Sequence, residues 1–560
     1  MCRRFNSGSC HHFEHPYDSM KYRPLFAASL PLLAIAALCC ALPALRAADA
    51  REPAPTTGAQ KSDSPKKDEA SNAAPDKKEE AKGAASDKKE PKDELSETTN
   101  SVTINGVSVK YNAMAGTLVI KDEEGKARVS FFFVAYTRLD ATNAGERPVT
   151  FSFNGGPGSS SVWLHLGVLG PRRVFLKEDG SLPPPPFRLI DNQYSLLDES
   201  DLVFIDPVST GFTRAVPGED ARKYHGVDQD LQSVGDFIRL YTTRYKRWDS
   251  PKFLIGESYG TTRAAGLSGY LENRFGMYLN GIALVSSVLD FSTISFNAGN
   301  DLPFVLYLPT ETAVAWFHKK LPPDLQADRK KALMESEQYA LGDYSRALVQ
   351  GSALSAPDRQ RVIKEVARLT GLSGDYVDRA NLRVHASRYF KELLRQERLI
   401  IGRYDARRTG TDLDAAGESA EYDPSFTSVL GPFTATLNDY VRRELKFESD
   451  LPYEVLTGKV QPWDFNDARN RYLDVAETLR RTMTHNPYLK VFVANGYYDM
   501  ATPYLATRYT FDHMGLPPNL QTNVSMGYYE AGHMMYVNQP SLAALKHDLA
   551  AFIRSALPPK

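Results

Sequence analysis

One pentapeptide constrains this chain more than any other feature: Gly256-Glu257-Ser258-Tyr259-Gly260, in the pattern G-x-S-x-G. It follows the apolar run Lys252–Ile255, and a helix-compatible stretch, Arg263–Leu271, comes after it. A strand, a sharp turn and a helix in this order form a nucleophile elbow, where a strained serine projects its hydroxyl above a sheet. The helix N-terminus behind the serine favours developing negative charge. The pattern predicts that Ser258 is a nucleophile, although the pentapeptide alone would also fit an ordinary turn.

The rest of the chain supplies the sheet that such an elbow needs. Short apolar runs alternate with helical stretches, and the predicted strands are Val149–Phe153, Leu202–Ile205, Phe253–Ile255, Gly281–Val285, Val491–Ala494 and Val524–Tyr528. Three strand-like runs precede them: Val102–Val109, Gly116–Lys121 and Val129–Tyr136. Strands alternating with helices predict a mostly parallel sheet with helices on both faces. Together with the elbow, this pattern predicts an α/β-hydrolase fold.

Residues 295–480 interrupt the alternation. They carry Arg, Leu, Ala and Tyr at helical spacing, for example in Asp358–Leu369 and Ala386–Arg398. We expect a largely helical cap domain there, inserted into a core formed by residues 101–294 and 481–560. A helical insertion of this kind usually covers the active site.

The first hundred residues have the features of a targeting segment and a linker. Lys21 and Arg23 precede an apolar run at 30–45, and Ala47 and Ala48 follow it, so residues 1–48 are predicted to be an N-terminal extension and a cleavable signal peptide. Met20 would be a better start for this signal than Met1. An uncleaved anchor, or a lipid anchor on one of two adjacent cysteines, is the alternative. Residues 49–100 are rich in Ala, Lys, Glu, Asp and Pro, which predicts a disordered linker.

The signal predicts an exported protein, either periplasmic or secreted. The chain contains four cysteines, Cys2, Cys10, Cys39 and Cys40, and all of them lie within the predicted signal segment. The mature protein would therefore have no disulfide, which a large core does not require. We also expect no stable membrane span after signal cleavage.

A nucleophilic serine needs a base, and three histidines lie near the C-terminus. His547 and His513 stand in helical stretches, where a solvated histidine is the ordinary interpretation. His533 lies in a loop after the final predicted strand, where this fold places its base. Asp499 follows the penultimate strand and is the predicted acid that orients the imidazole; Asp512 is the competing carboxylate, in a helical setting.

A glycine-rich loop follows the strand Val149–Phe153. Its sequence is Asn154-Gly155-Gly156-Pro157-Gly158-Ser159-Ser160-Ser161. Adjacent glycines let backbone N–H groups turn towards a bound carbonyl oxygen, as in the oxyanion loops of esterases. A plain Gly-Pro turn is the alternative interpretation.

Four motifs in order resemble the serine carboxypeptidases, peptidase family S10, over residues 100–556. The loop at 154–161 resembles the family's N-G-G-P-G-x-S-S, and 256–260 its G-E-S-Y-[AG]. The segment Leu202–Phe212 resembles L-F-[LI]-D-x-P-x-G-x-G-F with one residue missing. Ala531-Gly532-His533-Met534, with Gln539-Pro540, resembles A-G-H-M-V-P…Q-P.

The resemblance implies roles for particular residues. Ser258, Asp499 and His533 would form the triad, and the backbone N–H groups of Gly156 and Tyr259 the oxyanion hole. The substrate's terminal carboxylate would be held by Asn154, Gly155 and Glu257, with Met534 near the leaving residue. A carboxyl group on Glu257 beside a substrate carboxylate cannot easily stay ionised, so binding would favour acidic pH. Alternatively, Glu257 only fills its place in the elbow.

The sequence departs from the family's pattern at several positions. Ser152 stands where a tryptophan is usual, and Met535-Tyr536 replaces the final V-P. Val168 stands where the family has a glutamate that supports the elbow carboxyl, which weakens the expectation of acidic pH. With the missing disulfides, these differences point to a bacterial branch.

The balance of charge lowers the expectation of two kinds of partner. Lys and Arg (67) almost cancel Asp and Glu (68), which removes an electrostatic reason to bind nucleic acid or an anionic membrane. Asp and His are not clustered at metal-ligand spacing, so we expect neither metal nor cofactor.

We therefore expect a carboxypeptidase that acts on peptides with a free C-terminus. The alternatives are an esterase or acyltransferase with the same triad, or a catalytically inactive envelope protein that binds a partner. The oligomeric state and the side-chain preference are not indicated by the sequence.

Overall fold

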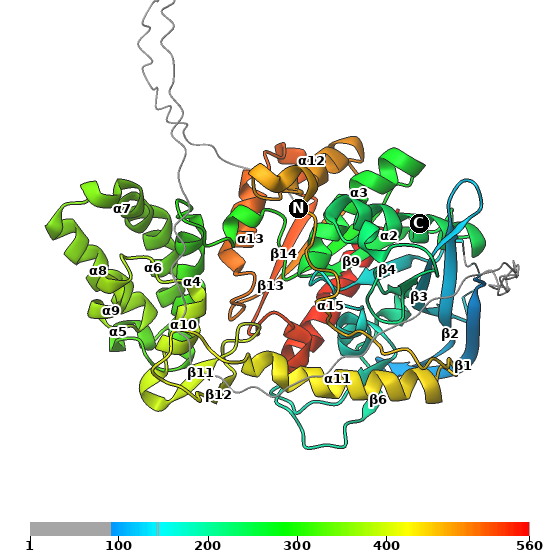
Figure 1. Ribbon diagram of the computed structural model, residues 1–560, viewed down its shortest axis with the longest axis horizontal. Coiled ribbons are helices and arrows are strands. Elements are labelled where there is room, and N and C mark those ends of the chain that lie inside the picture. The colour runs from blue at the N-terminus through cyan, green and yellow to red at the C-terminus, as the bar shows by residue number, and fades with distance from the viewer. Residues whose placement is uncertain (1–90, 142, 144, 559–560) are drawn as a thin grey trace, which may run out of the picture. The chain divides into compact units, whose positions relative to one another are not determined.

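The computed structural model describes residues 91–141, 143 and 145–558 (Figure 1). The predicted signal peptide, the four cysteines and residues 49–90 of the predicted linker lie outside this range. Among the described residues, no helix is both long and apolar enough to cross a bilayer.

A twisted central sheet organises the described chain. Its strand order is β1-β2-β3-β7-β4-β9-β10-β13-β14, with the short strand β8 paired to β3. The six strands from β7 to β14 run parallel, and the first three are antiparallel. The strands of this sheet are β1 Glu94–Ile104, β2 Val107–Lys121, β3 Ala127–Arg138, β4 Val149–Phe153, β7 Asp201–Ile205, β8 Arg214–Ala215, β9 Lys252–Glu257, β10 Gly281–Val285, β13 Lys490–Gly496 and β14 Val524–Tyr529. This is the predicted α/β-hydrolase fold, and its mostly parallel sheet is confirmed.

Successive side chains of the central strands enter two different cores. In β9, Phe253 and Ile255 belong to one apolar cluster, while Leu254 belongs to the cluster on the opposite face. Because neighbouring strand residues point to opposite faces, a strand buried on both faces is apolar throughout. Helices α2 Val227–Arg244, α3 Tyr259–Phe275 and α12 Ala476–His485 cover one face, and α11 Pro424–Arg443 and α15 Gln539–Ser555 cover the other.

The N-terminal strand differs from the sequence prediction. The predicted strand Val102–Val109 is divided by a turn, because Asn105 and Gly106 both adopt positive φ, 49° and 79°. These angles suit a tight hairpin, and an Asn-Gly pair is a strong hairpin signal. The first strand also begins at Glu94, so residues 94–100 pair with β2 instead of belonging to a linker.

A helical insertion follows β10 and a short connection, as expected. Its apolar cluster joins residues from Val305 to Ala406 with Tyr498 and Met500, which follow β13. Its helices are α4 Leu302–Phe317, α5 Pro323–Gln326, α6 Arg329–Tyr339, α7 Ser345–Gln350, α8 Ala356–Thr370, α9 Gly374–Arg379 and α10 Ala386–Glu392. The predicted helix Ala386–Arg398 ends early at Glu392, because the chain turns at Arg398, which has φ 56°, into the strand β11 Leu399–Ile401.

The end of the insertion packs on the main sheet. Val429 and Phe433 of α11 belong to the same apolar cluster as Phe253 of β9. The remaining elements are short: α1 Val162–Leu164, α13 Tyr504–His513, α14 Pro518–Gln521, and the paired strands β5 Arg172–Val174 with β6 Leu189–Asp191 and β11 with β12 Thr409–Thr411.

Candidate active site

Ser258 stands at the junction of β9 and α3, on strained backbone. Its φ is 60° and its ψ is −130°, a conformation that non-glycine residues rarely adopt. The turn is so tight that a Cβ atom on Gly256 would lie 2.1 Å from the carbonyl oxygen of Gly260. The glycine at 256 is therefore a steric requirement of the elbow, and the serine side chain is left half-buried at the wall of a pocket.

His533 and Asp499 come together from the loops after β14 and β13. Nδ1 of His533 lies 2.8 Å from Oδ2 of Asp499, and both side chains are buried. Asp499 is held by the backbone N–H groups of Ala501, at 2.8 Å, and Thr502, at 3.0 Å, and by the Thr502 hydroxyl, at 2.8 Å. These donors keep the carboxylate in place, so it can fix the ring's orientation and tautomer.

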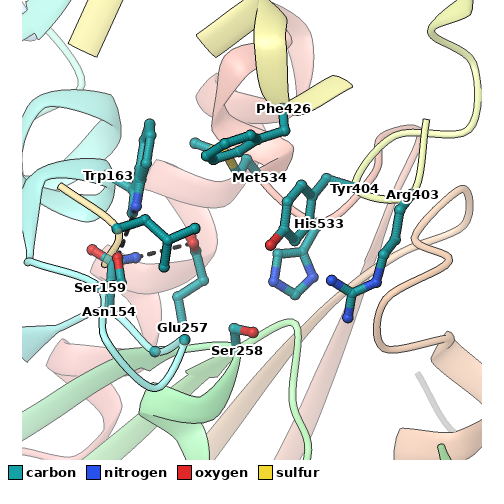
Figure 2. Close-up of a pocket in the computed structure, with 13 residues that line it drawn as sticks. Asn154, Ser159, Trp163, Glu257, Ser258, Arg403, Tyr404, Phe426, His533 and Met534 are labelled. Carbon is teal, nitrogen blue, oxygen red and sulfur yellow. Dashed lines mark hydrogen bonds between the residues drawn. The ribbon is translucent and has the colours of Figure 1, made fainter. Parts of the chain in front are cut away.

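The other imidazole nitrogen is available for chemistry. Nε2 of His533 is buried and has no hydrogen-bond partner among the described residues, and the ring faces the pocket above Ser258 (Figure 2). Burial alone would lower the pKa of His533, but the Asp499 carboxylate outweighs it and raises that pKa above its ordinary value. No hydrogen bond joins Ser258 to His533 here; such bonds are often long until substrate is bound.

The glycine-rich loop lies against the start of α3. A Cβ atom on Gly155 would lie 2.4 Å from the backbone nitrogen of Tyr259, so the loop can approach the helix this closely only with glycine. Tyr259 is the first residue of α3, where N–H groups have no intrahelical acceptor. Gly156 lines the pocket together with Ser258, and the first turn of α3 follows the serine directly.

Glu257 and Asn154 form a buried polar pair next to the nucleophile. Nδ2 of Asn154 donates to Oε1 of Glu257 at 3.0 Å, and Oδ1 of Asn154 accepts from the Leu164 backbone at 3.1 Å. Glu257 is 3% exposed. Burial raises the pKa of this carboxyl, and the nearby His533 opposes part of that effect. The resulting pKa is about 7. At neutral pH and below, a large fraction of Glu257 is therefore protonated and able to donate a hydrogen bond.

All the predicted binding residues meet in one pocket. Its lining residues are Asn154, Gly155, Gly156, Ser159, Trp163, Glu257, Ser258, Arg403, Tyr404, Phe426, Leu456, His533 and Met534. The polar groups of Asn154 and Glu257 lie on one side, with Trp163 and Phe426 above them and Arg403 on the far side of His533 (Figure 2). The predicted oxyanion residue Tyr259 follows Ser258 directly but is not among the lining residues.

Sequence reasoning did not identify several of the residues that line this pocket. Arg403, Tyr404, Phe426 and Leu456 come from the insertion, where helical periodicity does not show which side chains reach the site. Trp163 follows the glycine-rich loop directly, and its Nε1 donates to Ser159 at 2.9 Å, so its position after that motif could have indicated it.

A buried ion pair that the sequence analysis did not identify supports the elbow. Arg263 of α3 lies 2.7 Å from Asp230 of α2, and both are almost fully buried. The same guanidinium donates to the Asn154 carbonyl oxygen at 2.6 Å. Arg263 therefore ties the glycine-rich loop to the helix that begins at Tyr259.

The competing residues lie away from the pocket. His513 and Asp512 are exposed at the end of α13, and His547 is exposed on α15. Ser152 and Val168 are completely buried, so neither contributes to the pocket surface. Among the described residues, no group of three or more His, Cys, Asp or Glu side chains is arranged to hold a metal ion.

The sequence is similar to known carboxypeptidases. Residues 106–296 match the family model described as serine carboxypeptidase. Serine carboxypeptidase-like 34 from Arabidopsis thaliana is 28% identical over 204 residues, 33% of this chain and 36% of that protein. Pheromone-processing carboxypeptidase KEX1 from Saccharomyces cerevisiae is 32% identical over 145 residues, 25% of this chain and 19% of that protein. The matched part thus spans well under half the length of these relatives.

The fold is similar to that of a solved carboxypeptidase. The crystal structure of Kex1(delta)p, a prohormone-processing carboxypeptidase from Saccharomyces cerevisiae, superposes with a TM-score of 0.50 at 17% identity, covering 79% of this chain and 91% of that one. The matched family model spans the glycine-rich loop, β9 and the elbow, and the two relatives are named as a serine carboxypeptidase-like protein and a carboxypeptidase. Over residues 106–296, which hold the glycine-rich loop and the elbow, the chain is similar to the serine carboxypeptidase family.

Proposed function

We propose that this protein is a serine-type carboxypeptidase that removes single residues from the C-terminus of peptides through an acyl-enzyme. The observation that carries the proposal is the buried pair of Glu257 and Asn154, hydrogen-bonded at 3.0 Å in the same pocket as Ser258. A hydrolase that only cleaves esters or amides has no need for a buried carboxyl group one residue from its nucleophile.

The arrangement supports the following sequence of steps. Ser258 Oγ attacks the scissile carbonyl carbon while Nε2 of His533 takes the hydroxyl proton, and the Asp499 carboxylate stabilises the resulting imidazolium. The backbone N–H groups of Gly156 and Tyr259 stabilise the oxyanion. His533 then gives the proton to the departing amine, which leaves Ser258 acylated. Water, deprotonated by His533, hydrolyses the acyl-enzyme and restores the serine.

The terminal carboxylate would be held by three groups. Asn154 uses one N–H of its amide on Glu257 and has a second for the substrate. The backbone N–H of Gly155 and the protonated carboxyl of Glu257 are the other donors. Protonation is essential, because two adjacent carboxylates repel each other strongly at a buried site.

The side chains that line the pocket also favour one class of leaving residue. Trp163 and Phe426 form its wall above Asn154, and Met534 lies beside them (Figure 2). Aromatic and thioether side chains provide favourable apolar contacts, so peptides that end in an apolar residue are the proposed substrates.

The cellular setting is proposed from the sequence alone. The charged, apolar and small-residue pattern of residues 1–48 supports export, to the periplasm or the medium. The departures at Ser152, Val168 and Met535-Tyr536, with cysteines confined to the first forty residues, support a bacterial branch of the family.

One comparison tests the function. Hydrolysis rates are measured for a blocked dipeptide with a free C-terminus and for its C-terminal amide, with Ser258→Ala protein as the blank. The proposal predicts a much higher kcat/KM for the free acid at acidic pH. Equal rates on the two substrates would instead indicate an esterase or general amidase, and no turnover of either would indicate an inactive binding protein.

A further inference from the structure

Two buried side-chain oxygen atoms, one on Glu257 and one on Tyr536, lack hydrogen-bond partners among the described residues. They are Oε2 of Glu257 and the hydroxyl oxygen of Tyr536. Tyr536 is only 2% exposed. Leaving a buried polar atom unsatisfied costs about 1–3 kcal/mol, so two such atoms close together require an explanation.

The structure places these two groups beside each other. The Tyr536 hydroxyl lies near enough to Glu257 and Asn154 to affect their electrostatics, although its geometry is not that of a hydrogen bond in this structure. Tyr536 does not line the pocket of Ser258; it lines a second pocket together with Gly167 and Phe433.

A glycine makes room for the Tyr536 ring. Tyr536 belongs to the short helix Met535–Val537, directly after His533 and Met534. Its ring packs on Gly167, where an added Cβ atom would lie 2.4 Å from the Cε2 atom of Tyr536. Any larger residue at 167 would push the hydroxyl away from Glu257.

The groups that face Glu257 come from several elements. His533 and Asp499 approach from the loops after β14 and β13, Tyr404 from the insertion and Tyr536 from its short helix. Asn154 contributes an uncharged amide. Tyr536 and Asn154 are uncharged donors, so a hydrogen bond from either to Glu257 involves no change of net charge.

We infer that Tyr536 is a positioning residue for Glu257, whose hydroxyl engages Oε2 so that the carboxyl presents a fixed orientation to the substrate's carboxylate. The substrate carboxylate in this inference comes from the proposed function. The contact between Tyr536 and Glu257 does not depend on that function. Asn154 already occupies Oε1, so the acidic proton belongs on Oε2.

The phenol suits both protonation states of this carboxyl. When Glu257 is ionised, the Tyr536 hydroxyl donates to Oε2. When Glu257 is protonated, Oε2 keeps one lone pair for the Tyr536 donor and directs its own proton to the substrate. Burial holds the pKa of Tyr536 well above its ordinary value, so the phenol stays neutral throughout.

This arrangement has a measurable consequence for the pKa of Glu257. A donor to the ionised carboxylate opposes the effect of burial, so Tyr536 lowers the pKa that Glu257 would otherwise have. Removing the hydroxyl should raise that pKa by about one unit or more, the size expected from losing one hydrogen bond to a charged group.

The first test uses no substrate. The protonation of Glu257 is followed by pH-difference infrared spectroscopy of the full chain, with the carboxyl band assigned by its loss in Glu257→Gln. Tyr536→Phe should move the midpoint to higher pH. The matched control is Tyr529→Phe, which removes a buried hydroxyl paired with Asp548 on α15 and should leave the midpoint in place. An unchanged midpoint in Tyr536→Phe would overturn the inference.

A second variant distinguishes loss of this hydrogen bond from a general change in folding. Replacing Tyr536 with a fluorinated tyrosine keeps the ring but makes the hydroxyl a stronger donor, so the midpoint should move to lower pH. A shift in the same direction as Tyr536→Phe would contradict the inference.

Kinetics then connect this residue to the reaction. The ratio of kcat/KM for a free-acid peptide to that for its amide should decline with pH, and Tyr536→Phe should move the decline to higher pH. If the wild-type ratio is 1 at every pH, the proposed function fails, while the infrared midpoint still decides the role of Tyr536.

Discussion

Nδ1 of His533 lies 2.8 Å from Oδ2 of Asp499, although the two residues are 34 positions apart and follow different strands. The parallel pairing of β13 with β14 brings these loops to the same edge of the sheet. The elbow after β9 ends at that edge as well, because β9, β10, β13 and β14 all run in one direction. Strand order therefore brings Ser258, His533 and Asp499, the proposed nucleophile, base and acid, to one edge of the sheet.

The first prediction concerns Asp499→Asn. Asparagine can keep the shape of the site but favours the wrong imidazole tautomer, so kcat should fall by about 10³–10⁴ with little change in KM. Steady-state hydrolysis of a blocked dipeptide measures this effect. Asp512→Asn, an exposed carboxylate at the end of α13, is the control and should retain full activity. A loss of less than tenfold in Asp499→Asn would remove Asp499 from the triad.

The second prediction is a pH dependence of substrate binding. The pKa of Glu257 is raised by burial to about 7, so its protonated form, and with it carboxylate binding, is present below that pH and is lost as the pH rises through it. KM for a free-acid peptide should rise about tenfold per pH unit above the midpoint, as for loss of one proton. In Glu257→Gln, which donates at every pH, KM should be nearly flat, and a persistent rise would assign the pH effect to another group.

The third prediction concerns the apolar wall. Phe426→Ala should lower the preference for phenylalanine over alanine as the leaving residue by about tenfold, because part of the apolar contact is lost. The ratio of kcat/KM for the two peptides measures this preference. Leu413→Ala, an exposed leucine of the insertion, should not change it. An unchanged ratio in Phe426→Ala would place the leaving residue elsewhere.

The fourth prediction concerns stability. Asp230→Asn leaves the Arg263 guanidinium buried without its counter-charge, which should cost about 3–5 kcal/mol in the free energy of unfolding. The exposed pair Arg346 and Asp343 is the control, since Asp343→Asn should cost at most about 1 kcal/mol. Urea titrations followed by circular dichroism compare the variants. Equal, small costs for both would show that Arg263 gains little from Asp230.

Most of the fold could be predicted from the sequence because its signals are local. The strand Val149–Phe153 is five buried residues in a row, and the structure has the same bounds. The hairpin at Asn105-Gly106 has an equally local signal, but strand-forming residues stand on both sides of it, so the two strands were predicted as one. The early end of the helix at Glu392 depends on pairing with β12, which local periodicity does not show.

The residues of the candidate site likewise fall into those with a local sequence signal and those without one. Ser258, Glu257 and the glycine-rich loop belong to contiguous motifs, so their proximity follows from two adjacent strands. The contacts of Arg263 with Asp230, and of Tyr536 with Gly167, join distant parts of the chain and leave no periodic pattern. The pocket wall from Arg403 to Phe426 depends on how the insertion folds over the sheet, which composition alone does not determine.

The central claim, that Ser258 is the nucleophile of a carboxypeptidase, is tested most directly with a fluorophosphonate probe and Ser258→Ala protein. Intact mass and peptide mapping should find one adduct, on Ser258, and labelling should stop hydrolysis of the free-acid dipeptide. Ser258→Ala should fold normally, take up no probe and hydrolyse nothing. Turnover by pure Ser258→Ala protein, or an adduct on a different serine, would contradict the account.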